Sequence, residues 1–340
     1  MPREPQERPP ESRAADVVRV GAIDIGSNSI RQVVADVTGS GDVEVLAEER
    51  ATPRLGTGLA ATGALGEQPM QGAIEALERM ADRARRMGCA MLVAVATSAV
   101  RDASNGAAFL QRVREATGVD VRILTGEEEA LLGFRSALAH FDIASGPAVV
   151  MDIGGGSLEL AFGMDGVPGR LLSLPLGAVR LSEQFPRATV GGEELRALRR
   201  HVRAMLCAAV PEGDRRTSLV IGSGGTFTNL ARMHLARRGL SRERPRHATR
   251  ISGVDLEAIL DSLARTPLAE RGEVPGLDPG RGDIIVPGLA VAAEVLAALH
   301  VDELLASRYG IREGLLLEAA GVRPSGARSA DGPNEPTDQT

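Results

Sequence analysis

Residues 148–162, AVVMDIGGGSLELAF, form the most informative segment of this sequence. They predict a buried strand over 148–151, an acidic residue (Asp152) at its end, a turn of three glycines, and a second strand over 157–162. Glycine lets bare backbone N–H groups point at an anion. A carboxylate beside such a turn can hold a metal ion that neutralises the same anion. The segment therefore predicts a hairpin that binds phosphate.

The same plan occurs a second time near the start of the chain. Residues 18–37, VRVGAIDIGSNSIRQVVADV, again place two strands around a small polar turn, with Asp24 where the later segment has Asp152. A third glycine turn, GSGGT at 222–226, precedes a predicted helix, and a helix N-terminus is a common seat for phosphate. The repeat predicts two lobes of similar design that face each other.

Length and composition limit the possible classes of protein. A chain of 340 residues suits two domains, and its net charge of −6 argues against a protein that coats nucleic acid. No run approaches the ~18 apolar residues of a membrane span, and the N-terminal residues lack the apolar region of a secretory signal. We therefore expect a cytoplasmic protein that binds neither nucleic acid nor membrane. Cys89 and Cys207 have no disulfide or metal-ligand spacing and are expected to be small buried side chains.

The order of the predicted elements indicates the domain organisation. Strands and helices alternate in both halves, which predicts an α/β fold with layered sheets. We expect a first lobe over 17–126, a second lobe over 127–306, and a segment over 307–322 that packs back onto the first lobe. Residues 1–16 and 323–340, rich in Pro, Gly, Ser and charge, are expected to be disordered tails. Helices are predicted at 70–87, 104–116, 126–140, 193–209, 227–237, 254–265, 281–299 and 312–320, and a loop at 50–66.

Asp24, Asp152 and Glu159 are the candidate metal ligands. Asp is common at strand exits for purely structural reasons, but the matching placement of Asp24 and Asp152 favours a shared site for metal and phosphate. Glu159 lies on the outgoing strand of the second hairpin, where a surface-facing carboxylate is an equally good interpretation.

Three glutamates, Glu127, Glu128 and Glu129, open a predicted helix after Thr125. The helix dipole favours acids in a first turn by about 0.3–1 kcal/mol each, which requires no function. Thr125 and Glu128 have the spacing of a capping box, so Glu129 points elsewhere and is free for another role. A spare carboxylate at the seam between the lobes is a candidate general base.

Several arginines lie beside small or glycine-containing loops. Most arginines in such a chain are solvated, but together these could supply the basic groove that the net charge does not. The five histidines are scattered without ligand spacing, and the sequence contains no Walker loop, nucleophile elbow or Cys–His pairing. The arginines are Arg31, Arg54, Arg101, Arg180 and Arg312.

The sequence resembles the exopolyphosphatase/guanosine pentaphosphate phosphatase family in eight ordered segments: AIDIGSNSIRQVV, ATSAVRDASN, ILTGEEEALLGF, VVMDIGGGSLELAFG, LGAVRLSE, GSGGTFTNLA, IIVPGLAV and YGIREGLLL. The match spans about residues 18–321. The resemblance implies the two-lobed α/β fold of the actin-like ATPase/sugar kinase (ribonuclease H-like) superfamily, with the active site in the cleft between the lobes. It also implies hydrolysis of a terminal phosphoanhydride with the help of Mg²⁺, or of Mn²⁺.

The resemblance implies roles for individual positions. The family's catalytic glutamate falls on Glu129, in agreement with the capping argument. Leu158 replaces the hydroxyl residue that is usual in the second glycine loop, which predicts the loss of one contact to phosphate or to metal-bound water. Together with the glycine turns and arginines above, the predicted phosphate-binding residues are Ser27, Asn28, Ser29, Arg31, Arg54, Arg101, Gly154, Gly155, Gly156, Ser157, Gly224, Gly225 and Thr226.

We expect an exopolyphosphatase that releases orthophosphate from inorganic polyphosphate. The alternatives are a guanosine pentaphosphate phosphohydrolase, a phosphotransferase of the sugar-kinase kind, and a sensor that binds phosphorylated nucleotides without turnover. Glu129 argues against the sensor, because a pure binder needs no general base. The chain ends soon after Gly321, without the extra C-terminal helical domains of long family members, which leaves chain-length preference open. A homodimer is the expectation from family analogy.

Overall fold

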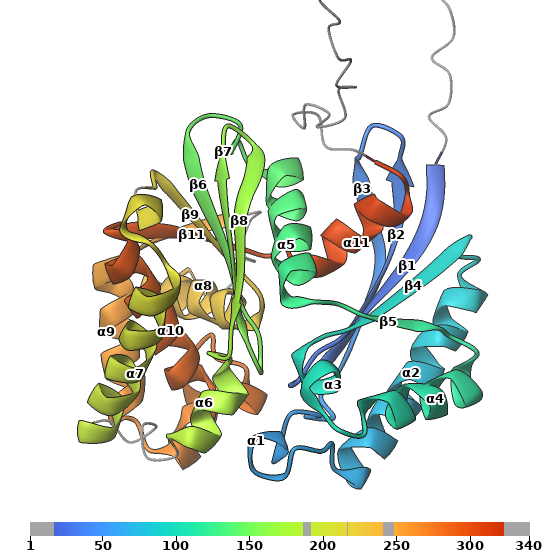
Figure 1. The fold of residues 1–340 in the computed structure, drawn as a ribbon, viewed down its shortest axis with the longest axis horizontal. Coiled ribbons are helices and arrows are strands. Elements are labelled where there is room, and N and C mark those ends of the chain that lie inside the picture. Colours follow the sequence, from blue (N-terminus) through green and yellow to red (C-terminus); the bar gives the residue numbers. More distant parts are fainter. Residues whose placement is uncertain (1–16, 186–191, 216, 241–247, 323–340) are drawn as a thin grey trace, which may run out of the picture.

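The chain forms two lobes that lie side by side, each built on one β-sheet (Figure 1). The predicted two-lobed α/β fold is therefore confirmed. The tails predicted at 1–16 and 323–340 lie outside the described residues. The structure is a computed structural model that describes residues 17–185, 192–215, 217–240 and 248–322.

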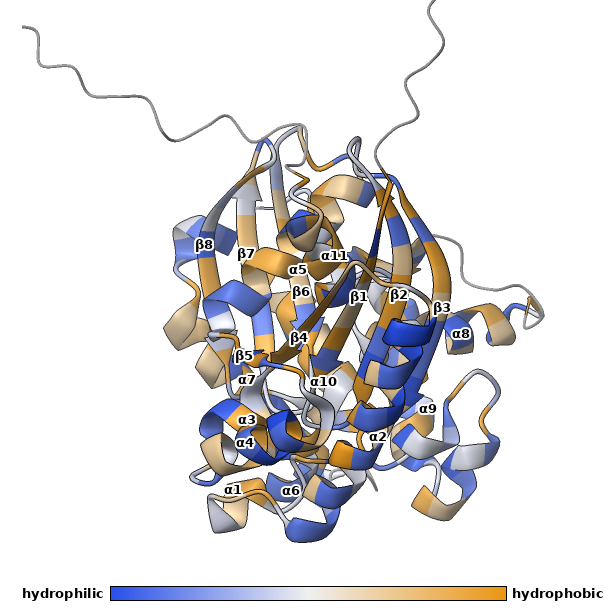
Figure 2. Ribbon diagram, turned by 90° about the vertical axis from the view of Figure 1, so that its right-hand side faces the viewer, coloured by the Kyte–Doolittle hydropathy of each residue, from blue (hydrophilic) through white to orange (hydrophobic). Residues whose placement is uncertain are grey.

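The first lobe has a five-stranded sheet. Its elements are β1 (Val17–Ile25), β2 (Ile30–Thr38), β3 (Val43–Ala51), α1 (Leu59–Thr62), α2 (Glu67–Arg86), β4 (Met91–Ala96), α3 (Ser98–Asp102), α4 (Gly106–Thr117), β5 (Val121–Ile123) and, from the C-terminal end, α11 (Ile311–Ala319). The strand order is β3-β2-β1-β4-β5, with β4 and β5 parallel to β1 and the other neighbours antiparallel. Figure 2 shows mostly hydrophobic strands behind α2, which turns hydrophilic residues outward.

Alternation along β1 determines where its acidic residue lies. Successive side chains of a strand point to opposite faces. Ile23 and Ile25 share a core cluster with side chains of α2 and α4, whereas Val20 and Ala22 share one with side chains of α11. Asp24 has the parity of Ala22, so it leaves the end of the strand on the α11 side, toward the second lobe.

The second lobe has a six-stranded sheet in the order β10-β11-β9-β6-β7-β8. Its elements are α5 (Gly126–His140), β6 (Pro147–Ile153), β7 (Leu158–Met164), β8 (Val167–Leu174), α6 (Ala178–Gln184), α7 (Glu193–Ala209), β9 (Leu219–Ser223), α8 (Gly225–Arg237), β10 (Ala248–Ser252), α9 (Gly253–Arg265), α10 (Ile285–Leu299) and β11 (Glu303–Ser307). Side chains of α7 to α10 share one core cluster on one face of this sheet, and α5 covers the other face.

The register of the second hairpin brings its polar residues to one end of the sheet. Asp152 on β6 lies opposite Glu159 on β7 and opposite Ser223 on β9. Because Val150 on β6 and Ala161 on β7 pack with α5, Asp152 and Glu159 have the parity of the α5 face. That face is turned toward the first lobe (Figure 1).

The seam between the lobes is formed by α5 and α11. Leu132 of α5 lies in one core cluster with Leu315 and Leu316 of α11. Any side chain at Gly314 would overlap the backbone of Leu132, so glycine at this position is what allows the two helices to touch. Figure 1 shows both helices between the two sheets.

Most predicted elements are confirmed, and the differences have local causes. The predicted helix 193–209 coincides with α7. The structure adds α3, α6 and β10, which are five to seven residues long and too short for periodicity to reveal. The helix predicted from 281 begins only at Ile285, because Pro279 to Arg281 form a separate 3₁₀ turn.

Two smaller expectations are corrected. The loop predicted over 50–66 contains the four-residue helix α1, which begins and ends at glycines in the left-handed conformation. Cys207 is exposed, and Cys89 is half-buried, so the expectation that both are buried is wrong. Within the described ranges, no helix is both long and apolar enough to span a bilayer.

Candidate functional site

A cavity of about 100 Å³ lies between the lobes, where three glycine turns approach one another. The turns follow β1, β6 and β9, and β6 and β9 are parallel neighbours whose carboxyl ends meet at one edge of the sheet. The first turn of α5 and the chain crossing from β11 to α11 complete the wall. The predicted residues that line this cavity are Asp24, Ser27, Asn28, Ser29, Arg31, Glu129, Asp152, Gly154, Gly155, Ser157, Glu159, Gly224, Gly225 and Arg312.

The first turn, between β1 and β2, presents buried polar groups. Ser27, Asn28 and Ser29 are all at least nine-tenths buried. Ser27 Oγ lies 2.9 Å from Ser98 Oγ of α3, which fixes its position. Neither amide atom of Asn28 has a hydrogen-bond partner among the described residues. Since buried polar groups are nearly always paired, the Asn28 amide indicates a place for a polar ligand.

The second turn touches the first. A Cβ on Gly155 would lie 2.8 Å from Ser27 Cβ and 3.0 Å from the backbone N of Asn28. A Cβ on Gly156 would overlap Ser98 Oγ. Glycine is therefore required at both positions for the lobes to meet at this depth.

Leu158 does not belong to the site. Its side chain is fully buried in the core of the second lobe, with Leu160 and Leu176, while its neighbours Ser157 and Glu159 line the cavity. A hydroxyl at position 158 would point into that core. The expectation that Leu158 removes a contact to phosphate is wrong.

The third turn packs around two charged side chains. Gly224 has a φ of 90°, and a Cβ there would lie 2.5 Å from Asp152 Oδ1. Asp152 Oδ2 accepts a hydrogen bond of 2.8 Å from Ser223 Oγ. A Cβ on Gly225 would overlap the guanidinium of Arg281. Because α8 begins at Gly225, its unpaired N–H groups and its dipole favour an anion at this side of the cavity.

Asp24 and Asp152 place two carboxylates in the cavity wall. Burial raises the pKa of Asp24 to about 6, against the opposing effect of Arg312 and Arg31, and burial also raises the pKa of Asp152. Asp24 Oδ1 has no hydrogen-bond partner among the described residues. Burial makes it costly to ionise both carboxylates. A cation bound between them would offset that cost.

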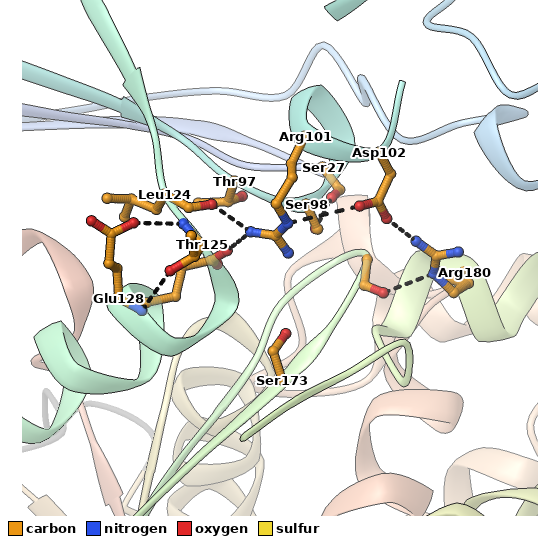
Figure 3. Close-up of polar contacts among 12 residues, drawn as sticks. Ser27, Thr97, Ser98, Arg101, Asp102, Leu124, Thr125, Glu128, Ser173 and Arg180 are labelled. Atoms are coloured by element: carbon orange, nitrogen blue, oxygen red, sulfur yellow. Dashed lines mark hydrogen bonds and ion pairs between the residues drawn. The ribbon is translucent and has the colours of Figure 1, made fainter. Parts of the chain in front are cut away.

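Glu129 is buried on the first turn of α5, 3% exposed, and forms an ion pair with Arg101. Arg101 Nη1 also donates a hydrogen bond of 2.7 Å to the Leu124 carbonyl, which places the guanidinium at the end of β5, close to Thr125 and Glu128 (Figure 3). Burial raises the pKa of Glu129 to about 7, and Arg101 acts against this rise. A carboxyl that exchanges its proton near neutral pH is suited to general-base catalysis.

Glu159 is also buried, 2% exposed, which excludes the surface-facing alternative. Ser173 Oγ donates to its Oε1 at 2.9 Å. Burial and, next, the charge of Glu129 raise the pKa of Glu159 well above its usual value. The residues that the structure describes contain no group of three or more His, Cys, Asp or Glu side chains that could hold a metal ion by themselves, so the role of Glu159 as a third ligand stays a prediction.

Five predicted residues do not line this cavity in the described part of the chain. Arg180 pairs with Asp102 and donates to the Gly156 carbonyl. Arg101 does not line the cavity itself but forms an ion pair with Glu129, which does. Arg54 pairs instead with Asp283 of the second lobe. Gly156 borders a small hollow next to the cavity, and Thr226 is packed beneath Gly288 of α10.

The prediction from sequence missed Arg281. This guanidinium lines the cavity at 6% exposure, and its Nε has no hydrogen-bond partner among the described residues. Burial, together with the nearby charges of Arg31 and Arg50, lowers its pKa to about 9. The sequence signal for Arg281 is the run DPGRGD at 278–283, which places an arginine between two glycines. The helix predicted over 281–299 includes this arginine and hides the turn. Arg308, next to the crossing from β11 to α11, also lines the cavity and was not among the predicted residues.

The predicted capping box is present and can be tested separately from Glu129. Thr125 N donates to Glu128 Oε2 at 2.7 Å, and Glu128 N donates to Thr125 Oγ1 at 3.2 Å. We expect Glu128→Ala to lower the free energy of unfolding by about 1 kcal/mol and to leave kcat close to the wild-type value. Glu127→Ala is the matched control, because it also removes an acid from the first turn but no cap. Urea denaturation measures the difference, and a loss of kcat as large as that of a Glu129 variant would contradict the assignment.

A site with these properties is typical of one class of protein. Bare N–H groups and buried arginines stabilise phosphoryl oxygens, and a carboxyl with a near-neutral pKa can take a proton from water. These are the requirements of an enzyme that hydrolyses or transfers phosphoryl groups. The model of the Ppx/GppA phosphatase family matches residues 33–322. The chain belongs to this family, as the ordered motifs predict.

Known relatives match nearly the whole chain. Exopolyphosphatase 1 of Mycobacterium tuberculosis is 33% identical over 304 residues, 88% of this chain and 88% of that protein. Exopolyphosphatase 2 of the same species is 32% identical and covers 90% of this chain and 99% of its own length. Among solved structures, an exopolyphosphatase from Cytophaga hutchinsonii has a TM-score of 0.83 at 25% identity, covering 90% of this chain and 99% of its own. A Ppx/GppA family member from Aquifex aeolicus has a TM-score of 0.76 at 27% identity, covering 89% and 97%.

Proposed function

We propose that this chain is an exopolyphosphatase, which hydrolyses the terminal phosphoanhydride of inorganic polyphosphate. The observation that carries the proposal is Glu129, a buried carboxylate with a pKa of about 7 in the wall of an anion-binding cavity. Two relatives that are named exopolyphosphatases and match about nine-tenths of the chain support the choice of substrate.

In this proposal, backbone and guanidinium groups bind the terminal phosphate. The turn after β6, at Gly155, and the N-terminus of α8 at Gly225 offer N–H groups to its oxygens, whereas the N–H of Gly154 donates to the Ser157 carbonyl within the turn. Arg31 and Arg281 offset its charge from either lobe.

Glu129 then orients the attacking water and accepts its proton. Arg101, bound to both Glu129 and the Leu124 carbonyl, holds the carboxylate in one position. Phosphoryl transfer depends mainly on positioning and on stabilisation of charge. A preformed cavity whose turns are held in contact, as at Gly155 and Ser27, meets that requirement.

We include Mg²⁺ in the proposal, held by Asp24 and Asp152. Mg²⁺ is usually bound through one or two carboxylates together with phosphate oxygens and water, so this pair fits it. The unpartnered Oδ1 of Asp24 supports the assignment. When bound, the ion supplies positive charge that offsets the negative charge of the phosphates. Mn²⁺, which prefers the same oxygen ligands, is the second candidate.

A wider groove adjoins the cavity and favours polyphosphate over guanosine pentaphosphate. Its volume is about 570 Å³, and it shares Arg31, Thr228, Arg308 and Arg312 with the cavity wall. Arginines outnumber acids, and no aromatic side chain is among the described lining residues. A phosphate chain carries charge on every unit, whereas a guanine base binds best to an aromatic platform. The lining residues are Arg31, Glu48, Glu49, Arg50, Thr228, Asn229, Arg232, Asp278, Arg308 and Arg312.

Phosphate release by the purified protein tests the proposal. We expect release from polyphosphate of short, intermediate and long chain length, with a higher kcat/KM than for guanosine pentaphosphate. Addition of EDTA should abolish release, and an excess of Mg²⁺ should restore it. The reverse order of kcat/KM would favour the guanosine pentaphosphate phosphohydrolase. Absence of release from both substrates would leave a binding protein as the better interpretation.

A further inference from the structure

One segment of the second lobe, beside the cavity, forms ion pairs with the first lobe. This segment, Asp278 to Asp283, has the sequence DPGRGD. Arg54 Nη1 lies 2.5 Å from Asp283 Oδ2, and Arg54 Nη2 lies 3.2 Å from Asp283 Oδ1. The same Nη2 donates to the Gly280 carbonyl at 2.9 Å. Arg50 forms a second ion pair between the lobes, with Asp278, and both residues line the adjoining groove.

On the first lobe, the turn that carries Arg54 is joined to the first glycine turn of the cavity. Arg54 has a φ of 58°, a left-handed conformation that is uncommon for a residue with a side chain. Its backbone N donates to the Asn28 carbonyl at 3.2 Å, and the N of Gly56 donates to the Ser27 carbonyl at 2.7 Å. A Cβ on Gly56 would lie 2.8 Å from Ser27 Cβ. Any movement of Arg54 therefore moves the wall at Ser27 and Asn28.

On the second lobe, Arg271 forms a hydrogen bond with the backbone of the segment. This side chain is fully buried. Its Nη1 donates to the Gly282 carbonyl at 3.0 Å, and its Nε donates to the Thr266 carbonyl at 3.1 Å. The segment is thus a fixed support, and it carries Arg281 into the cavity from between its two bridging aspartates.

We propose that Arg54 and Asp283 are a positioning pair that sets the separation between the Ser27–Asn28 turn and Arg281. These two walls approach the phosphate from opposite lobes. Arg54 then acts through Asp283 and is not itself a phosphate ligand, which differs from its predicted role. The proposal rests on the proposed function and adds to it the residues that set the geometry of the site.

The exposed fractions of the two side chains indicate whether loss of the pair will change kcat or the Tm. The side chains of Arg54 and Asp283 are 38% and 36% exposed, and exposed ion pairs contribute little to the stability of a fold. A misplacement of about 1 Å in an active site can nevertheless lower a rate by about 10²-fold. We therefore expect the loss of this pair to change kcat while the Tm stays close to that of the wild type.

A double-mutant cycle separates the two roles of Arg54. We expect Arg54→Gln and Asp283→Asn each to lower kcat for polyphosphate by up to about 10²-fold, and the double variant to lose no more than either single variant. If Arg54 instead binds phosphate directly, Asp283→Asn leaves kcat unchanged or lowers KM, and the pair is overturned. Additive losses would also overturn it. Arg265→Gln and Asp261→Asn, both exposed on α9, are the controls.

A structural readout keeps this test separate from the proposed function. If the wild-type protein releases no phosphate from polyphosphate, the proposed function falls, and small-angle X-ray scattering then tests the pair. We expect both single variants to show a larger radius of gyration than the wild type and the two controls. A radius of gyration that is unchanged in Asp283→Asn would then overturn the positioning pair.

Discussion

Glu129→Gln is expected to lower kcat for polyphosphate hydrolysis by about 10²–10⁴-fold, the usual contribution of a general base. Glutamine keeps the size of the side chain and an oxygen that can accept a hydrogen bond from Arg101, but it cannot take a proton from water. KM should change little, because Glu129 is expected to contact water and not the bound phosphates. Steady-state kinetics on polyphosphate measures both constants. A rate near that of the wild type would show that another group is the base.

The pH dependence of the wild-type protein and of Glu129→Gln tests whether Glu129 is the general base. Glu129 must be ionised to act as a base, and its pKa is about 7. The wild-type kcat/KM should therefore fall about tenfold per unit as the pH drops below about 7. Glu129→Gln should lack this acidic fall in kcat/KM.

The stability of the two proteins should also depend differently on pH. A carboxyl whose pKa rises on folding from 4.5 stabilises the fold below pH 4.5, and this stabilisation is lost as the pH rises through about 7. The Tm of the variant should accordingly fall less over that range.

Arg281→Met is expected to lower kcat by about 10²–10³-fold, the magnitude found when one preorganised donor to a transition-state oxygen is removed. The guanidinium is buried in the cavity wall, and its Nε has no protein partner among the described residues. Removing a buried cation of this kind relieves a desolvation cost, so the Tm should stay the same or rise.

The combination of lower kcat and unchanged or higher Tm distinguishes a binding role from a structural one. Arg265→Met, at an exposed position on α9, is the matched control and should leave both quantities unchanged. Arg281→Lys keeps the charge but loses the paired donors and should recover only part of the activity. If Arg281→Met keeps the wild-type kcat, Arg281 has no part in binding the phosphate.

The parts of the site that follow from local physics could be predicted from the sequence. The glycine turns after β1, β6 and β9 follow from strand patterns that end in glycine and a small polar residue. The capping box is encoded in four consecutive residues, of which Thr125 and Glu128 supply the side chains. Because Glu128 makes the cap, Glu129 is left for the cavity. In each case the determining contacts lie within a few residues of one another.

Contacts between distant segments could not be predicted in the same way. Arg281 reaches the cavity because α8 begins with a glycine that leaves room for its guanidinium, and no local pattern records that space. Arg54 lies near the cavity, as expected, but its partner is Asp283, more than 200 residues away. The alternation of Ser157 and Glu159 around Leu158, in contrast, was visible in the sequence and could have placed Leu158 in the core.

The contact between Gly155 and Ser27 also affects how the product leaves. Orthophosphate keeps the three terminal oxygens of the cleaved phosphate and gains a fourth from water, so a cavity that binds those three oxygens also retains the product. While the remaining phosphate chain fills the groove, separation of the two lobes at this contact is the expected exit route for the product. Domain motions of this kind take microseconds to milliseconds and often limit turnover. Separation of the lobes at this contact is therefore an expected step after hydrolysis, distinct from the chemical step that Glu129→Gln and Arg281→Met are expected to slow.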